Sequence, residues 1–138
     1  MVSDLEWDAL LAAARRVRDN AHAPYSRFAV GAAVLDEAGR IHAGCNVENA
    51  AYPQGWCAET SALAHLVATG ARHVRAVVVV GLASDPQVPV TPCGGCRQRL
   101  REFAADDCPV WSADLSTVRA RFTLGQLLPV SFGPEHLK

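Results

Sequence analysis

The sequence predicts an α/β protein, a three-layer α/β/α sandwich in which helices cover both faces of a mixed five-stranded sheet. Segments with helical spacing of apolar residues alternate along the chain with short segments of strand character. Residues 74–81 are apolar at nearly every position, as expected of a central strand buried on both faces. The 138 residues, half of them hydrophobic, suit a single domain over 1–138 with its own core.

The first half of the chain predicts a helix, a strand hairpin and a second helix. Ser3 and Glu6 form a capping box before apolar residues at helical spacing. A turn ending at Gly39 joins two short strands, which we expect to pair antiparallel. The predicted elements of the whole chain are helices over 3–20, 57–70 and 92–105 and strands over 28–35, 40–47, 74–81, 109–113 and 117–123.

The second half continues the alternation. Gly70 is a typical C-terminal stop for the second helix. A polar, proline-bearing link over 83–90 separates the central strand from the helix that follows Pro92. Thr123 and Gln126 resemble a second capping box, which indicates a short helix near the C-terminus.

The charge and the hydropathy pattern exclude several classes of partner. The net charge is −1, with acidic and basic residues interspersed, so the basic surface of a nucleic-acid-binding protein is missing. No apolar run reaches membrane-spanning length, and residues 1–6 do not resemble a signal segment. The five cysteines are typical of thiols in a reducing compartment. We therefore expect a cytoplasmic protein with a small-molecule substrate, without nucleic-acid or membrane partners.

Three cysteines have the spacing of metal ligands. Cys93 and Cys96 form a Cys-x-x-Cys pair at a predicted helix start, where the helix dipole favours thiolates. Cys57 opens another predicted helix and is the candidate third ligand. Structural zinc normally has four protein ligands, whereas catalytic zinc leaves one position open. Three ligands therefore favour one catalytic Zn²⁺ per chain.

Glu59 indicates which chemistry the metal would serve. It lies two residues after Cys57, and residues with this spacing do not share a helix face. We expect its carboxylate beside the metal as a proton shuttle, the catalytic role, and not as a ligand. A Cys-x-x-Cys pair alone would fit a redox dithiol or half of a zinc ribbon equally well, but neither requires Cys57 and Glu59.

The combined motifs resemble those of zinc-dependent cytidine deaminases, in particular the small, homotetrameric, three-cysteine kind. Cys57-Ala58-Glu59 and the run from Pro92 to Gln98 match the zinc motifs of this family. Tyr25-Ser26-x-Phe28-x-Val30-Gly31-Ala32-Ala33 resembles its first-strand segment, and Cys45-Asn46-Val47-Glu48-Asn49-Ala50 resembles its nucleoside segment. The similarity covers nearly the whole chain.

The resemblance implies an enzyme of pyrimidine salvage. The expected reaction is zinc-dependent hydrolysis of cytidine and 2′-deoxycytidine to uridine and 2′-deoxyuridine with release of ammonia. Glu59 would carry protons from the attacking water to the base. The C-terminal run 125–132 resembles a family segment whose aromatic residue, here Phe132, stacks on a nucleobase in a neighbouring subunit of a homotetramer.

The same resemblance assigns substrate-binding roles to four residues. Phe28 would pack on the ribose and base, and the backbone N–H of Ala58 would hold the pyrimidine carbonyl region. Asn46 and Glu48 would bind the ribose 3′-hydroxyl, which suits an amide and a carboxylate because together they supply a donor and acceptors. Without the family, Phe28 could equally be a core residue, and Asn46 and Glu48 could belong to a solvated turn.

One position departs from the family pattern. Thr60 stands where an arginine commonly donates to the metal-bound sulfurs. Three thiolates and Zn²⁺ sum to −1, so we expect Arg97 to compensate most of that charge. Whether the weaker donor, the hydroxyl of Thr60, also reaches sulfur is left open. Cys45 and Cys108 have no partner at ligand spacing and are expected to be buried free thiols.

Two rival functions are left open by the residues. A deaminase of the same fold, such as one resembling blasticidin S deaminase, would share the zinc motifs but differ around the sugar segment. Phe28 and the segment from Asn46 to Glu48 argue against it. A thiol-redox or zinc-binding interaction protein could be built on Cys93 and Cys96. Metal content and an ultraviolet assay on cytidine would separate these functions.

Overall fold

The computed structural model describes residues 1–137, in which five strands form one mixed sheet in the order β2-β1-β3-β4-β5. β1 runs antiparallel to β2 and to β3, β3 runs parallel to β4, and β4 runs antiparallel to β5. The predicted hairpin and the central, fully covered strand are therefore confirmed. The strands are β1 (Gly31–Asp36), β2 (Ile41–Cys45), β3 (Val74–Val80), β4 (Pro109–Ala113) and β5 (Val118–Thr123).

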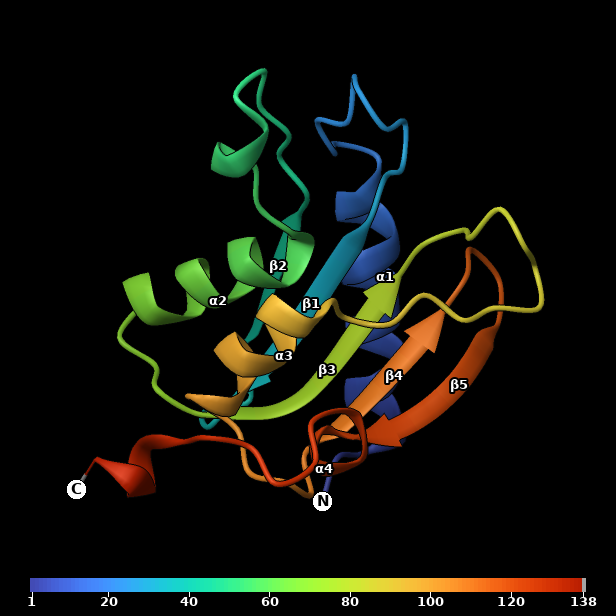
Figure 1. Ribbon diagram of the computed structural model, residues 1–138. Coiled ribbons are helices and arrows are strands. Elements are labelled where there is room, and N and C mark those ends of the chain that lie inside the picture. Colours follow the sequence, from blue (N-terminus) through green and yellow to red (C-terminus); the bar gives the residue numbers. More distant parts are fainter. Residues whose placement is uncertain (138) are drawn as a thin grey trace.

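Helices cover both faces of this sheet, which confirms the predicted three-layer α/β/α architecture. Figure 1 shows α1 (Asp4–Arg18) behind the sheet and α2 (Ala58–Ala68) and α3 (Gly94–Arg101) in front of it. Two apolar cores result, one between α1 and the sheet and one beneath α2 and α3. The short helices are η1 (Tyr52–Gln54), α4 (Leu124–Leu127) and η2 (Pro134–His136). Within residues 1–137, no helix has both the length and the apolar character that a bilayer crossing needs.

Two glycines of the hairpin allow helices to approach it closely. A Cβ atom on Gly44 of β2 would lie 2.4 Å from the backbone nitrogen of Ala62 in α2. A Cβ on Gly31 of β1 would lie 2.0 Å from the carbonyl oxygen of Ala14 in α1. Real Cβ atoms are not found at such distances from backbone atoms, so α1 and α2 can occupy these positions only because both residues lack one. This close packing fixes where the N-terminus of α2 lies.

Several element boundaries differ from the predicted ones. Both capping boxes are formed, but α1 ends at Arg18 and α3 ends at Arg101. The hairpin strands are shorter than the predicted 28–35 and 40–47 because the side chain of Asn46 takes the place of strand pairing. Asn46 Oδ1 accepts from Val30 N at 2.9 Å, and its Nδ2 donates to Phe28 O at 2.8 Å.

Candidate active site

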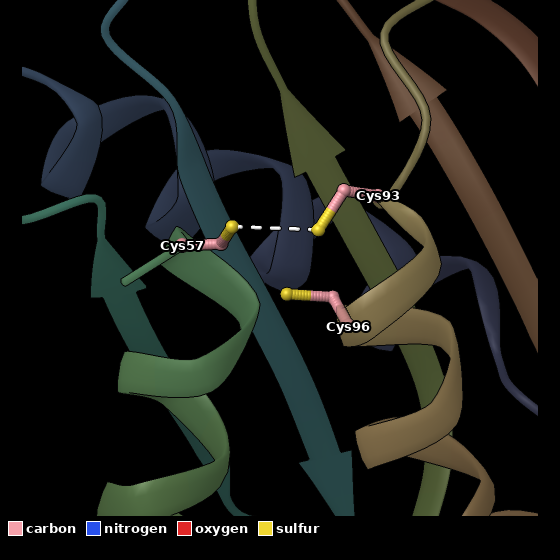
Figure 2. A group of neighbouring side chains, drawn as sticks. All are labelled: Cys57, Cys93 and Cys96. Carbon is pink, nitrogen blue, oxygen red and sulfur yellow. Dashed lines mark hydrogen bonds between the residues drawn. The ribbon is translucent and has the colours of Figure 1, made fainter. Parts of the chain in front are cut away.

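Three cysteine sulfurs meet where α2 and α3 begin. Cys57 is the N-cap residue of α2, Cys93 is the N-cap residue of α3, and Cys96 lies in the first turn of α3. The three Sγ atoms lie within 4.8 Å of one another, with 3.5 Å between those of Cys57 and Cys93 (Figure 2). Neither N-cap sulfur bonds to its own helix backbone, so both are free for a metal. This donor set suits zinc, which prefers thiolate sulfur, and leaves a coordination position for water.

Electrostatics at this cluster favour negative charge on sulfur. The neighbouring thiol of Cys57 hydrogen bonds to Cys96 and lowers the pKa of Cys96 to about 5, although partial burial opposes this shift. The hydroxyl of Thr60, 3.5 Å from Cys96 Sγ, and the positive charge of Arg99 act in the same direction. The same pairing raises the pKa of Cys57, because a second charge beside the first is unfavourable. A cation among the sulfurs would remove that repulsion.

Glu59 is buried beside the cysteine cluster. It is only 3% exposed, although it lies in the first turn of α2 next to a cavity. Burial, followed by the charge of Cys96, raises the pKa of Glu59 to about 7. A carboxyl group in this state can both take and release a proton near neutral pH, which is the property that a proton shuttle needs.

A cavity of about 540 Å³ opens in front of the cysteine cluster. Its volume is in the range of small-molecule sites. Its walls come from the segment before β1, the loop between β2 and α2, the start of α2, and residues near the start of α3. The residues lining it are Tyr25, Ser26, Phe28, Val30, Asn46, Val47, Glu48, Asn49, Tyr52, Gly55, Trp56, Cys57, Ala58, Glu59, Val79, Val90, Thr91 and Cys93. Four substrate-binding residues expected from the sequence, Phe28, Asn46, Glu48 and Ala58, therefore share one cavity with Glu59.

The polar wall of the cavity is held in place by hydrogen bonds between the segment before β1 and the segment after β2. The carboxylate of Glu48 accepts from the backbone N–H of Tyr25 at 3.0 Å, from that of Ser26 at 3.1 Å, and from the Ser26 hydroxyl. The bonds from Ser26 are the main reason why the pKa of Glu48 is lowered. A carboxylate offers about four acceptor positions, so one is left on Glu48, and Asn46 keeps one of its two Nδ2 hydrogens. A donor and an acceptor on the wall of one cavity suit a hydroxyl group.

The cytidine and deoxycytidylate deaminase zinc-binding region, a known protein family, matches residues 6–112. The chain belongs to the cytidine deaminase family. Within this family Cys57, Cys93 and Cys96 are the zinc ligands of the chain.

Relatives in this family cover almost the whole chain. The cytidine deaminase of Sporosarcina psychrophila is 41% identical over 133 residues, which are 96% of this chain and 96% of that protein. The cytidine deaminase of Mycobacterium tuberculosis is 40% identical over 134 residues, 97% and 95% of the two chains. The crystal structure of cytidine deaminase from Burkholderia pseudomallei superposes with a TM-score of 0.82 at 40% identity, covering 91% of this chain and 98% of that one. The deaminase fold predicted from the motifs is therefore confirmed.

The structure shows which groups contact the ligand sulfurs in place of the arginine that the family pattern led us to expect at position 60. The Thr60 hydroxyl does contact the sulfur of Cys96. Arg97, which we expected to compensate the thiolates, directs its guanidinium elsewhere: Nε donates to Pro92 O at 2.7 Å, Nη1 to Leu127 O at 2.8 Å, and Nη2 to Thr91 Oγ1 at 3.0 Å. Its observed contacts fasten α3 to the segments on either side. Arg99 is the cation that favours the Cys96 thiolate.

Phe132 is the one expected substrate-binding residue that lies outside the cavity of its own chain. Its ring is 56% exposed and stacks on His136 at a centroid distance of 4.8 Å. Its carbonyl accepts from Gln98 Nε2 at 2.9 Å, and Arg101 bonds to Ser131 and Glu135, so the C-terminal segment is tied to α3. In Figure 1 this segment runs along the bottom of the molecule, whereas the loops around residues 25 and 52 rise at the top.

Sequence reasoning missed part of the cavity wall. Trp56, directly before the ligand Cys57, is half exposed and lines the cavity. Its indole N–H donates to Ser61 Oγ at 2.8 Å, and that hydroxyl donates to Cys45 O at 2.8 Å. In the sequence, only the position of Trp56 next to the ligand Cys57 could have indicated that it belongs to the site. Of the two spare cysteines, Cys108 is buried as expected, whereas Cys45 is only partly buried.

Proposed function

We propose that the chain is a zinc-dependent cytidine deaminase that hydrolyses cytidine and 2′-deoxycytidine to uridine and 2′-deoxyuridine, with release of ammonia. The observation that carries this proposal is a buried carboxyl group, Glu59, beside three metal-binding sulfurs at the base of a cavity large enough for a nucleoside. The family membership supports it. The substrate is a free nucleoside, as the chain's net charge of −1 favours over a nucleic acid.

Zinc held by Cys57, Cys93 and Cys96 supplies Lewis acidity, which lowers the pKa of water towards neutrality. Glu59 performs the proton transfers. Its carboxylate accepts the proton of the attacking water and delivers it to N3 of the pyrimidine while oxygen adds to C4. Glu59 then takes the proton of the hydroxyl group now on C4 and transfers it to the amino group, which leaves as ammonia as the C4 carbonyl forms. Its raised pKa, near 7, suits both transfers.

The remaining cavity residues orient the nucleoside. The free acceptor of Glu48 and the free N–H of Asn46 bind the ribose 3′-hydroxyl. Phe28, 39% exposed at the cavity wall, packs against the ribose and base. The N–H of Ala58 belongs to the first turn of α2, where backbone donors have no helical partner, and it binds the pyrimidine carbonyl region.

Thr60 and Arg97 support the zinc ligands without binding the metal. The Thr60 hydroxyl donates to the Cys96 thiolate and takes over part of the role of the family's arginine. Arg97 fixes the start of α3, so that Cys93 and Cys96 keep their spacing, and its contribution to charge is indirect.

The assembly is a homotetramer in which Phe132 completes the site of a neighbouring chain. Its exposed ring and its absence from the lining of its own cavity support this assignment. The residues 1–138 act as a single catalytic domain. The enzyme works in the reducing cytoplasm, where its zinc thiolates remain reduced; all five cysteines are free.

An assay on two matched proteins tests the function. Purified enzyme should bind about one zinc per chain and should decrease the ultraviolet absorbance of cytidine as uridine forms. Glu59→Gln should retain zinc and still bind cytidine but lose roughly 10²- to 10⁴-fold in kcat, because the proton shuttle is removed. Near-normal turnover in zinc-loaded Glu59→Gln protein would disprove the mechanism. Zinc-loaded wild-type protein without activity on cytidine would disprove the function.

A further inference from the structure

Two histidines and an aspartate contact one another outside the catalytic cavity. His42 is on the edge strand β2 beneath α2, His65 is on α2, and Asp36 ends β1. The Nδ1 atoms of the two histidines are 3.1 Å apart, and His42 Nε2 is 2.8 Å from Asp36 Oδ2. None of the three lines the catalytic cavity. The deamination reaction uses none of them, so their arrangement needs another explanation.

The surroundings of Asp36 fix the tautomer of His42. Asp36 is fully buried, and its Oδ1 accepts from the backbone N–H of Ala38 at 2.8 Å and of Arg40 at 2.9 Å. Its Oδ2 accepts from Nε of Arg40 at 3.0 Å, so both carboxylate oxygens receive hydrogen bonds. The carboxylate is therefore an acceptor only, and His42 Nε2 must carry the proton that it donates. With Nε2 bound to Asp36, Nδ1 is the ring nitrogen of His42 that faces Nδ1 of His65.

We propose that His42 and His65 bind one divalent transition-metal ion through their Nδ1 atoms, with Asp36 orienting His42 from behind. Imidazole nitrogens bind zinc at about 2.0–2.1 Å, so two of them on one ion lie roughly 2.9–3.4 Å apart for bond angles between a right angle and a tetrahedral one. The observed 3.1 Å is within this range. A carboxylate on the far nitrogen is the usual support of a metal-binding histidine.

Access and charge also suit a cation. His42 is only 3% exposed, but His65 is on the exposed face of α2, so an ion can reach the pair from solvent. The buried carboxylate of Asp36 attracts the ion, and the opposing charge of Arg40 is on a side chain that is 53% exposed and therefore screened. Water completes the coordination shell. Imidazole ligands favour zinc, copper, iron or nickel over magnesium or calcium.

Nickel binding to the zinc-loaded enzyme tests this site, since Ni²⁺ prefers imidazole ligands. Calorimetric titration with Ni²⁺ alone should show one additional ion per chain, with the catalytic zinc retained in the same sample. His65→Ala should abolish this binding, and it should fold normally because His65 is exposed. His73→Ala removes another exposed histidine and should bind Ni²⁺ as the wild type does.

Two further readouts locate the ion. Paramagnetic Ni²⁺ should broaden the ring signals of His42 and His65 before those of other histidines. Because the ion joins α2 to β2 only in the folded state, Ni²⁺ should raise the melting temperature of wild type and His73→Ala but not of His65→Ala. Binding that is equal in His65→Ala, or the absence of any additional ion, would overturn the proposal and leave a simple hydrogen bond between the rings. Loss of one zinc for each nickel bound would also overturn the proposal.

Discussion

The polar wall of the cavity gives a quantitative prediction about the sugar. If Glu48 and Asn46 bind the ribose 3′-hydroxyl, then 3′-deoxycytidine removes the partner of both groups at once. Each side chain is already held by other bonds: Glu48 by Tyr25 and Ser26, and Asn46 by Val30 N and Phe28 O. Neither can turn away to find a new partner, so both bonds are lost.

The size of the effect follows from the two bonds. A hydrogen bond between neutral groups, as from Asn46, contributes about 1 kcal/mol, and one to a charged group, as to Glu48, contributes about 1.5–3 kcal/mol. The sum is about 2.5–4 kcal/mol, and each 1.36 kcal/mol is a factor of ten in rate. We therefore expect kcat/KM for 3′-deoxycytidine to be roughly 70- to 900-fold below that for cytidine.

Steady-state kinetics on three nucleosides can measure this effect. 2′-Deoxycytidine is the matched control, because it lacks a hydroxyl that we assign to neither side chain, and it should remain a good substrate. In Glu48→Gln, the ratio of kcat/KM between cytidine and 3′-deoxycytidine should shrink towards the contribution of Asn46 alone. Equal kcat/KM for cytidine and 3′-deoxycytidine would refute the assignment, as would an unchanged ratio in Glu48→Gln.

Three other predictions concern the metal, the assembly and acid stability. Cys93→Ala should lose zinc and melt at a lower temperature, because a ligand and its binding energy are removed; full zinc content by elemental analysis would exclude Cys93 as a ligand. Phe132→Ala should raise KM for cytidine without changing zinc content, and co-expression with Glu59→Gln chains should give more activity than the sum of the separate mutants. Monomers of full activity in sedimentation, or hybrids without rescue, would contradict the shared site. The pKa of Asp36 is lowered from 3.8 to about 2, so its ionised form stabilises the fold above the unfolded pKa, and this contribution is lost as the pH falls towards 2. Asp36→Asn should therefore lower the melting temperature at pH 7, and an equal deficit at about pH 2 would contradict this linkage.

Local sequence signals predicted the elements well where the chain's own neighbours decide the structure. The capping boxes of Ser3 with Glu6 and of Thr123 with Gln126 form as predicted, because both partners are three residues apart. The boundaries of the hairpin were wrong for the opposite reason. Asn46 bonds to Val30 and Phe28, which are 16 and 18 residues away, and strand propensity contains no information about such a partner.

The sequence by itself determined the zinc ligands and predicted Glu59 as the proton shuttle, because the residue types and their spacing at helix starts already indicate this chemistry. Only the tertiary structure decided how the other groups are used. Arg97 is directed to the carbonyls of Pro92 and Leu127, and His42 faces His65, through contacts between segments that packing brings together. Which groups hydrogen bond to each other depends on where they lie in space. For His42 and His65 that position depends on how closely α2 lies on the hairpin at Gly44, which spacing along the chain does not reveal.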